Sequence, residues 1–378
     1  MYAAVSGMKA HMNKLNVIGN NVANVNTFGY KSARTTFTES LYTSMRAGSN
    51  GSNSMGGVNP AQLGYGANIS TIDLDMSSKS YVPTGRAMDC AIGGDGFFLV
   101  GTKSEMITGD SGGDDAYTLA PKSAADLMLT RVGDFTFDSQ GYLTDGRGNV
   151  VYGFVTCSNG DAAGEKGTDP GVADPDDYLV STQLVPIRLP LAAVGSGTPD
   201  DLDTYIPAGA AIFPGVIDGA NVYSTDPDLT TGKPIACNME SITIDGKTGM
   251  ITGYNNATES QVVIGYIPLA KVTNPYGVTH QNGPYYRAGE GAGDCTVASV
   301  GGALGDAYLD NKAAGEDGAI PIFGTGSVTI NDGGLEASGT DIATEFSEMI
   351  STQRGYQANT RIITVTDAML EELVNIKR

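Results

Sequence analysis

The chain has 378 residues, a formal net charge of -20 and 40% hydrophobic residues. That hydrophobic content excludes disorder along the whole length, and the length allows two or three domains with a sizeable core. The acidic balance excludes a general affinity for nucleic acid or anionic lipid. The 52 glycines and 16 prolines, without any tryptophan, indicate many turns and short strands.

Residues 2–26 are predicted to form the first helix, because apolar residues recur at intervals of three and four and so share one face. A helix with one apolar face needs a partner surface in water. Several asparagines weaken its intrinsic helicity, so we expect a segment that is unfolded before assembly and helical after it. The apolar positions are Val5, Met8, Met12, Leu15, Ile18, Val22 and Val25.

The stretch from residue 33 to residue 66 is predicted to be an extended connector, since its second half is rich in Gly, Ser, Asn and Met. Strand patterns begin near residue 67. Two similar hairpins are expected, one turning at residues 138–141 and one at residues 245–249. Residues 158–235 are the most acidic and least patterned part, which favours an inserted domain with long loops.

The last helix is predicted from about residue 341 to the end of the chain, with Ser338, Thr340 and Asp341 as alternative caps. Its interruption around Gln353 and Tyr356 is either ordinary helix surface or a polar layer between subunits that fixes register. The positions expected on its apolar face are Ile342, Phe346, Met349, Gln353, Tyr356, Ile363, Leu370, Leu373 and Val374.

The resulting fold class is α+β and multidomain. We expect a terminal helical domain from residues 1–32 and 335–378, a connector over 33–66, a first β domain from 67–157 and 262–334, and an inserted outer β-rich domain over 158–261. The two helices are expected to pair with each other and with the same helices of neighbouring copies, so the sequence predicts an assembling protein.

Residues that would mark an enzyme or a metal site are scarce. His11 and His280 are the only histidines, and no motif joins either of them to a nucleophile. The aspartate runs at 169–177 and 198–203 fit no calcium-binding pattern, so we interpret them as solvated loops. We therefore expect neither a catalytic residue nor a metal or other cofactor.

The four cysteines, Cys90, Cys157, Cys237 and Cys295, are widely spaced without a C-x-x-C pair, and isolated buried thiols are the favoured interpretation. No apolar run is long enough to span a membrane. The first residues lack the apolar core and cleavage site of a secretory signal, so export is expected to use a route without one.

Several long motifs, in one order along the chain, resemble bacterial flagellar axial proteins of the hook and basal-body rod family. The N-terminal signature, the opening of the first β domain, its hairpin, the return to that domain and the C-terminal signature all have counterparts here. One departure is Gly339-Thr340, where relatives carry Asn-Val, which affects only the helix cap. The matching stretches are residues 4–32, 84–100, 129–154, 262–286 and 333–378.

The resemblance implies an inner tube made by the terminal helices as a coiled coil around an open channel, with β domains outside. It implies helical polymerisation into a short curved tube that joins the rod to the filament, and type III export of a largely unfolded subunit to the cell exterior. Implied partners are other copies, rod and hook–filament junction proteins, the hook cap and the export apparatus, with neither nucleic acid nor membrane insertion.

Two alternative functions and one candidate crosslink remain open from the sequence. A distal rod subunit belongs to the same family, and the long middle segment favours the hook over it. A surface glycan-binding β protein would leave the terminal helices unexplained. Some relatives crosslink a Cys-derived residue to a neighbour's Lys, for which Cys157, Cys237 and Cys295 are possible positions that no motif distinguishes.

Overall fold

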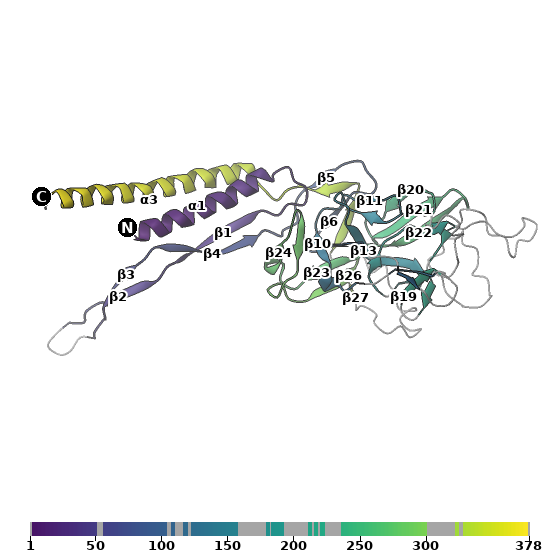
Figure 1. The fold of residues 1–378 in the computed structure, drawn as a ribbon, viewed down its shortest axis with the longest axis horizontal. Helices are drawn as coiled ribbons and strands as arrows, with labels where there is room; N and C mark the ends of the chain where they lie inside the picture. The colour runs from purple at the N-terminus through teal and green to yellow at the C-terminus, as the bar shows by residue number, and fades with distance from the viewer. Residues whose placement is uncertain are drawn as a thin grey trace, which may run out of the picture. The chain divides into compact units, whose positions relative to one another are not determined.

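A computed structural model describes residues 2–50, 56–103, 107–109, 116–119, 122–157, 179–181, 183–192, 211–213, 215–217, 220–223, 236–300, 322–324 and 328–376. The chain divides into two compact units, one from residues 1–76 and 338–378 and the other from residues 77–337. Among the described residues, the two long helices belong to the first unit and a large antiparallel sheet to the second, as Figure 1 shows. The α+β class predicted from the sequence is thus observed.

The first unit combines two long helices with a two-stranded ribbon. Strands β1 and β4 pair antiparallel, and β2 and β3 continue the ribbon beyond them. Its elements are α1 (Tyr2–Ala23), β1 (Ala33–Glu39), β2 (Tyr42–Arg46), β3 (Ala61–Gly64), β4 (Ala67–Leu74) and α3 (Ile342–Ile376).

The ribbon lies against α1, where the hydroxyl of Ser6 donates to the carbonyl of Tyr65 at 3.1 Å and the rings of His11 and Phe37 are 5.8 Å apart. The predicted connector is therefore extended but paired with itself. Residues 67–76 lie with the helices rather than in the β domain, because β4 is the partner of β1.

The second unit is built on a 12-stranded sheet whose main path runs β20-β21-β22-β13-β7-β10-β25-β24, with β11, β12, β14 and β15 attached beside β13. The first strands are β5 (Tyr81–Pro83), β6 (Cys90–Gly93), β7 (Phe98–Gly101), β8 (Ile107–Gly109), β9 (Ala116–Leu119), β10 (Met128–Thr130), β11 (Thr136–Phe137), β12 (Leu143–Thr144), β13 (Val150–Cys157), β14 (Leu179–Val180) and β15 (Val185–Pro186), with the single-turn helix η1 (Ala124–Asp126).

The later strands complete this sheet and add smaller ones; every described pair is antiparallel except β26 with β27. They are β16 (Leu191–Ala192), β17 (Ala211–Ile212), β18 (Gly215–Ile217), β19 (Ala220–Tyr223), β20 (Met239–Ile244), β21 (Met250–Asn255), β22 (Ser260–Tyr266), β23 (Leu269–Val272), β24 (Thr279–His280), β25 (Tyr285–Arg287), β26 (Cys295–Ser299), β27 (Ile322–Gly324), β28 (Thr329–Asp332) and β29 (Gly334–Glu336), with η3 (Pro275–Gly277).

The two predicted hairpins are present. In the first, the carboxylate of Asp138 accepts hydrogen bonds from the amides of Gln140 (2.9 Å) and Tyr142 (2.8 Å), and Gly141 supplies a positive φ of 82°. In the second, β20 and β21 are joined by a turn that ends in Gly249, with a φ of 69°. Both turns begin with Asp and end with Gly. The carboxylate accepts hydrogen bonds from backbone amides of the turn, and glycine adopts the positive φ that the last position requires.

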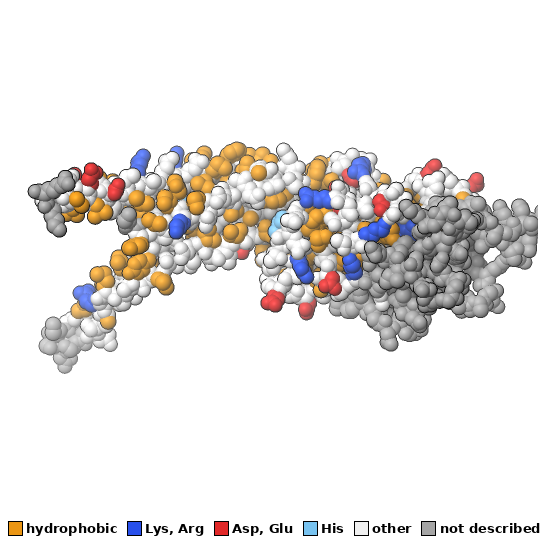
Figure 2. All heavy atoms as spheres, in the orientation of Figure 1, with side chains coloured by type: hydrophobic (Ala, Val, Ile, Leu, Met, Phe, Trp, Pro, Cys, Tyr) orange, Lys and Arg blue, Asp and Glu red, His pale blue; other side chains and the backbone are white. Residues whose placement is uncertain are grey.

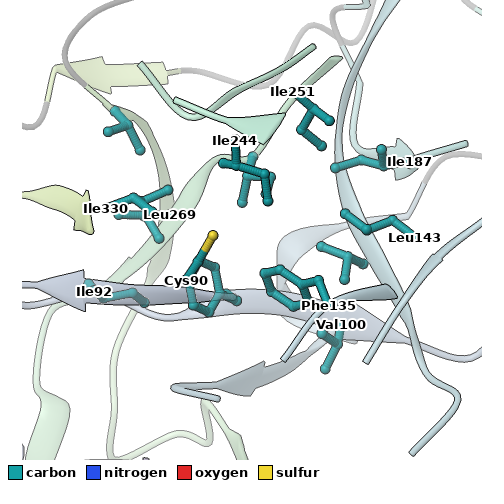
Figure 3. Packing of buried hydrophobic residues seen from close by; sticks show 14 of the residues in the cluster. Cys90, Ile92, Val100, Phe135, Leu143, Ile187, Ile244, Ile251, Leu269 and Ile330 are labelled. Atoms are coloured by element: carbon teal, nitrogen blue, oxygen red, sulfur yellow. The ribbon is translucent and has the colours of Figure 1, made fainter. Parts of the chain in front are cut away.

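A large apolar core lies within the second unit. Phe98, Phe135, Leu143, Ile187 and Ile251 are all fully buried and belong to one cluster, part of which Figure 3 shows. The rings of Phe98 and Phe135 meet edge to face at 5.0 Å. Strand β13 is buried along its whole length, as expected for a strand covered on both faces.

The predicted separate domain at residues 158–261 needs correction. Its described strands β15, β20, β21 and β22 belong to the same sheet as β7 and β13, and side chains from them fill the same core. Although this range is acidic in composition, its described residues Ile187, Ile244 and Ile251 lie in the core. The aspartate runs at 169–177 and 198–203 lie outside the described residues.

Candidate assembly surface

Small and polar side chains take part in the contact between α1 and α3. The helices run antiparallel, as Figure 1 shows: Gly7 of α1 meets Asn359 of α3, and Lys14 pairs with Glu348 at 3.0 Å. A Cβ placed on Gly355 would lie 2.8 Å from Cε1 of His11, so the absence of a side chain allows the helices to approach closely here.

At the other end of α1, the side chain of Asn21 is hydrogen-bonded to several segments of the helical unit. Its Nδ2 donates to the carbonyl of Ala33 and to Oε1 of Glu345, both at 2.9 Å. Its Oδ1 accepts from the amide of Ala33 at 3.0 Å and from the hydroxyl of Tyr30 at 3.1 Å. One side chain, 1% exposed, therefore connects α1, the following loop, β1 and α3.

Electrostatics at this junction follow from burial. Loss of solvent raises the pKa of Glu345, an effect that the nearby Glu348 increases and the hydrogen bond from Asn21 opposes. Burial, together with the charge of Glu345, also raises the pKa of Tyr30. Asp341, rather than Ser338 or Thr340, caps α3: its carboxylate accepts from the amide of Ala343 at 3.1 Å, and hydrogen bonds lower its pKa.

The predicted apolar face of α1 is only partly the face that packs inside the chain. The buried positions of this helix are Ala4, Ala10, Ile18 and Asn21. Of the predicted set, Ile18 is buried and Met12 is 47% exposed. The others, Val5, Met8, Leu15, Val22 and Val25, are half-buried.

The predicted face of α3 is divided between two sides of the helix. Met349, Tyr356 and Ile363 are half-buried, whereas Gln353 is exposed. The remaining predicted positions are exposed: Ile342 (43%), Phe346 (49%), Leu370 (49%), Leu373 (62%) and Val374 (68%). Thr352 is the only fully buried residue among the described positions of this helix.

Further exposed apolar residues were not predicted from the sequence. On α3 they lie at intervals of three and four over its last part: Ile362 (52%), Val365 (58%), Met369 (53%) and Ile376 (81%), with Ile350 (52%) earlier. A search for a second periodic face on the same helix would have found them. The ribbon adds Leu41 (80%), Tyr42 (54%), Met45 (74%) and Leu63 (53%).

These residues form the candidate assembly surface, which is defined as the exposed apolar positions of α3 and of the β2–β3 ribbon. Figure 2 shows hydrophobic side chains gathered over both elements. With 35 residues, α3 is longer than the 22-residue α1, so its last three to four turns run past Gly7 and the start of α1. Exposed apolar patches of this kind mark interaction surfaces.

The other residues considered in the sequence lie apart from this surface. Cys157 and Cys237 are buried in the β unit, and Cys295 is half-buried. All four cysteines are free, and burial raises the pKa of Cys237 to about 11, which disfavours the reactive thiolate. His11 and His280 lie in different units. Within the described residues there is no cluster of potential metal ligands and no helix that could cross a membrane.

Comparisons with known proteins agree at both ends of the chain. The family model "Flagella basal body rod protein" matches residues 1–31, and "Flagellar basal body rod FlgEFG protein C-terminal" matches residues 331–376. The two matches include the whole of α1 and of α3, the helices that carry the predicted assembly residues.

Full-length relatives extend the comparison. The flagellar basal-body rod protein FlgG of Bacillus subtilis is 29% identical, with 100% of this chain and 98% of the relative covered. The flagellar hook protein FlgE of Borreliella burgdorferi is 26% identical over 100% of this chain and 99% of its own length, and that of Escherichia coli is 26% identical over 99% of each.

Fold, exposed helices and relatives together define a structural protein of the bacterial flagellar axis. Within that class, the chain resembles flagellar hook and basal-body rod proteins over its full length, and the family models of these proteins match both of its ends. These proteins are structural subunits, which agrees with the prediction of an assembling protein.

Proposed function

We propose that the chain is the subunit of a flagellar hook, polymerising helically into a curved hollow tube that transmits torque from rod to filament. The observation that carries polymerisation is the exposed apolar surface of α3, which the chain's own α1 leaves uncovered. A full-length match to relatives named as hook proteins supports the hook in particular.

The energetics favour burial of this surface between copies. Val365, Met369, Leu373 and Ile376 are each more than half exposed. Covering them in a subunit contact would contribute on the order of 4–7 kcal/mol per chain, given about 1.5–3 kcal/mol for full burial of one such side chain. A contact that repeats from copy to copy without closing produces a helical tube.

In this proposal the parts of the chain have different mechanical roles. The α1 and α3 helices form the inner coiled-coil tube and resist torsion, because their contacts are apolar and densely packed in the polymer. The β unit lies outside and slides against its neighbours on polar faces as the tube bends. The ribbon formed by residues 33–74 absorbs the change in spacing.

The cellular setting follows from the same proposal. The subunit leaves the cell through the flagellar type III export apparatus and assembles outside it beneath a hook cap. Rod proteins would then contact one end of the tube and hook–filament junction proteins the other. Neither nucleic acid nor membrane insertion has a role in this assembly.

A distal rod subunit is the second candidate, since the Bacillus subtilis relative is named as a rod protein. The correction of the inserted domain also removes one argument for the hook, because the described part of residues 158–261 belongs to the main β unit. The shape of the polymer distinguishes the two: negative-stain microscopy of concentrated protein should show curved tubes for a hook and straight ones for a rod.

The polymerisation step itself is tested by substitution at an exposed position. Leu373→Lys should prevent tube formation at protein concentrations at which the unmodified chain assembles, while its circular dichroism stays unchanged because Leu373 is 62% exposed in the single chain. Leu373→Met keeps the apolar volume and should still assemble. Tubes of normal length from Leu373→Lys, or from a chain lacking residues 345–378, would contradict the proposal.

A further inference from the structure

The loop between β24 and β25 carries the pair Asn282-Gly283 at its tip. The amide of Gln281 donates to the carbonyl of Tyr285 at 2.8 Å and closes the hairpin just before this pair. Asn282 is exposed and Gly283 has a φ of 75°. Within the part of the chain that the structure describes, neither the side chain of Asn282 nor the backbone N–H of Gly283 makes a hydrogen bond.

Three other asparagines of the chain are held differently. The side-chain amide of Asn149 donates to Tyr285 at 2.7 Å and to Asp145 at 3.4 Å, and that of Asn21 is fully engaged at the helix junction. Asn274 is followed by Pro275, which has no N–H to react. Asn282 thus combines an unrestrained side chain with a following glycine. Because glycine has no side chain, it hinders the approach of its backbone nitrogen to the Asn282 side chain least.

A cation lies beside the reacting nitrogen. A Cβ on Gly283 would collide with the guanidinium of Arg147, so that group packs directly against the glycine. The guanidinium is held there above the ring of Tyr285, with its Cζ 5.8 Å from the ring centroid. Because a nearby positive charge favours the deprotonated form of an N–H group, Arg147 stabilises the anionic Gly283 nitrogen that must attack.

From this geometry we propose that Asn282-Gly283 is a site of spontaneous covalent modification that produces isoaspartate. The Gly283 nitrogen loses its proton and bonds to Cγ of Asn282, and the side-chain nitrogen leaves as ammonia, which closes a five-membered succinimide. Water then adds to one of the two ring carbonyls and breaks its C–N bond. Attack at the main-chain carbonyl gives isoaspartate, and attack at the side-chain carbonyl gives aspartate.

The product changes the hairpin in two ways. Isoaspartate adds one methylene to the main chain inside a loop closed by the hydrogen bond from Gln281 to Tyr285. It also places a carboxylate within reach of Arg147, a residue that now contacts an uncharged loop. The β24–β25 edge of the sheet is therefore expected to lose register in modified chains.

Trypsin provides a direct readout, because cleavage after Lys271 and Arg287 releases residues 272–287, in which Asn274 and Asn282 are the only asparagines. The purified full-length chain is incubated at mildly alkaline pH for days, digested and sequenced by mass spectrometry. We expect the mass increase of amide-to-acid conversion at Asn282 in two separable products, and an unchanged Asn274. An unmodified Asn282 would overturn the proposal.

Three variants separate the chemistry from general decay. Asn282→Gln should abolish conversion in this peptide, since glutamine would need a larger ring. Arg147→Gln should slow conversion at Asn282 several-fold relative to Asn159-Gly160, one of the two other Asn-Gly pairs of the sequence, while Arg147→Lys should restore part of the rate. The conversion rate at Asn282 is divided by the rate at Asn159 in the original chain, in Arg147→Gln and in Arg147→Lys. The same ratio in these three proteins would refute the role of Arg147.

Discussion

Asn21 shows how one buried polar residue organises the helical unit. In the sequence it is one of several asparagines that weaken the first helix, and nothing in its spacing sets it apart. In the structure it is 1% exposed and makes four hydrogen bonds that reach across more than 300 residues of chain to Glu345. A poor helix former is retained here because its amide pairs with groups from three other segments.

Asn21→Ala should therefore destabilise the helical unit strongly. The substitution leaves the amide and carbonyl of Ala33 without their partner inside the protein, so we expect the free energy of unfolding to fall by about 2–4 kcal/mol. Denaturant titration followed by circular dichroism measures it. Asn16→Ala, at an exposed position of the same helix, is the control and should be neutral or slightly stabilising. Equal effects at both positions would contradict this account.

A buried ion pair plays a comparable part in the β unit. Arg131 and Glu336, each 1% exposed, are 3.5 Å apart, and Arg131 also donates to the carbonyl of Gly94 at 2.9 Å. Burial lowers the pKa of Arg131, and the charge of Glu336 opposes that shift. Glu336 accepts from the amide of Lys79 as well, so the pair holds the first and last segments of this unit together.

Glu336→Gln should cost about 3–5 kcal/mol of unfolding free energy, because it leaves a buried guanidinium without its counter-charge. The matched change Glu348→Gln breaks the pair with Lys14, in which the glutamate is 48% exposed, and should cost less than about 1 kcal/mol. Thermal and chemical denaturation of the two variants side by side gives the comparison. A small effect at Glu336 would show that the buried pair is not a major stabilising contact.

At the scale of elements, the close approach of α1 and α3 depends on glycine. Gly7 and Gly355 face Asn359 and His11 across the contact, whereas Gly19 of α1 has open space where a Cβ would lie. Small and polar side chains thus take part in the contact between the two helices, while several apolar positions of α3, such as Leu373, stay exposed.

Alanine at these glycines should separate helix propensity from packing. Gly19→Ala gains about 0.5–1 kcal/mol from the lower flexibility of alanine in a helix. Gly355→Ala gains the same amount but forces the ring of His11 away, so its net effect should be destabilising. Helix content and denaturation midpoints of both variants provide the test, and stabilisation by Gly355→Ala would show that the helices do not pack as described.

At the scale of the whole molecule, the two units are unequally stabilised. The β unit contains the large core cluster around Phe98 and Phe135, while the helical unit buries few large apolar side chains and exposes many. Since apolar burial is the main favourable term in folding, the helical unit should be the weaker of the two.

We accordingly expect two thermal transitions in the single chain. The helix signal in far-UV circular dichroism should disappear first, and calorimetry should show a second transition for the β unit at higher temperature. Polymerisation should raise the temperature of the first transition towards that of the second, because contacts between subunits stabilise the folded helical unit. One transition with coincident signals at low protein concentration would contradict this division.

Much of this architecture was predictable from the sequence. The periodicity of three and four residues gave both helices, the Asp-to-Gly turns gave both hairpins, and the terminal motifs gave the family. These features are local, because a helix or a turn is specified by residues within a few positions of each other. The limits of the helices agree closely with the prediction, since α1 ends at Ala23 and α3 begins at Ile342.

Tertiary structure alone decided which faces are buried and which residues join distant segments. The predicted apolar face of α3 divides into half-buried positions such as Ile363 and exposed ones such as Leu373, because α1 contacts α3 through Gly7 and His11 instead. Likewise, Ile187 belongs to the main core although it lies in an acidic, poorly patterned range. Burial depends on partners hundreds of residues away, which a local pattern does not specify.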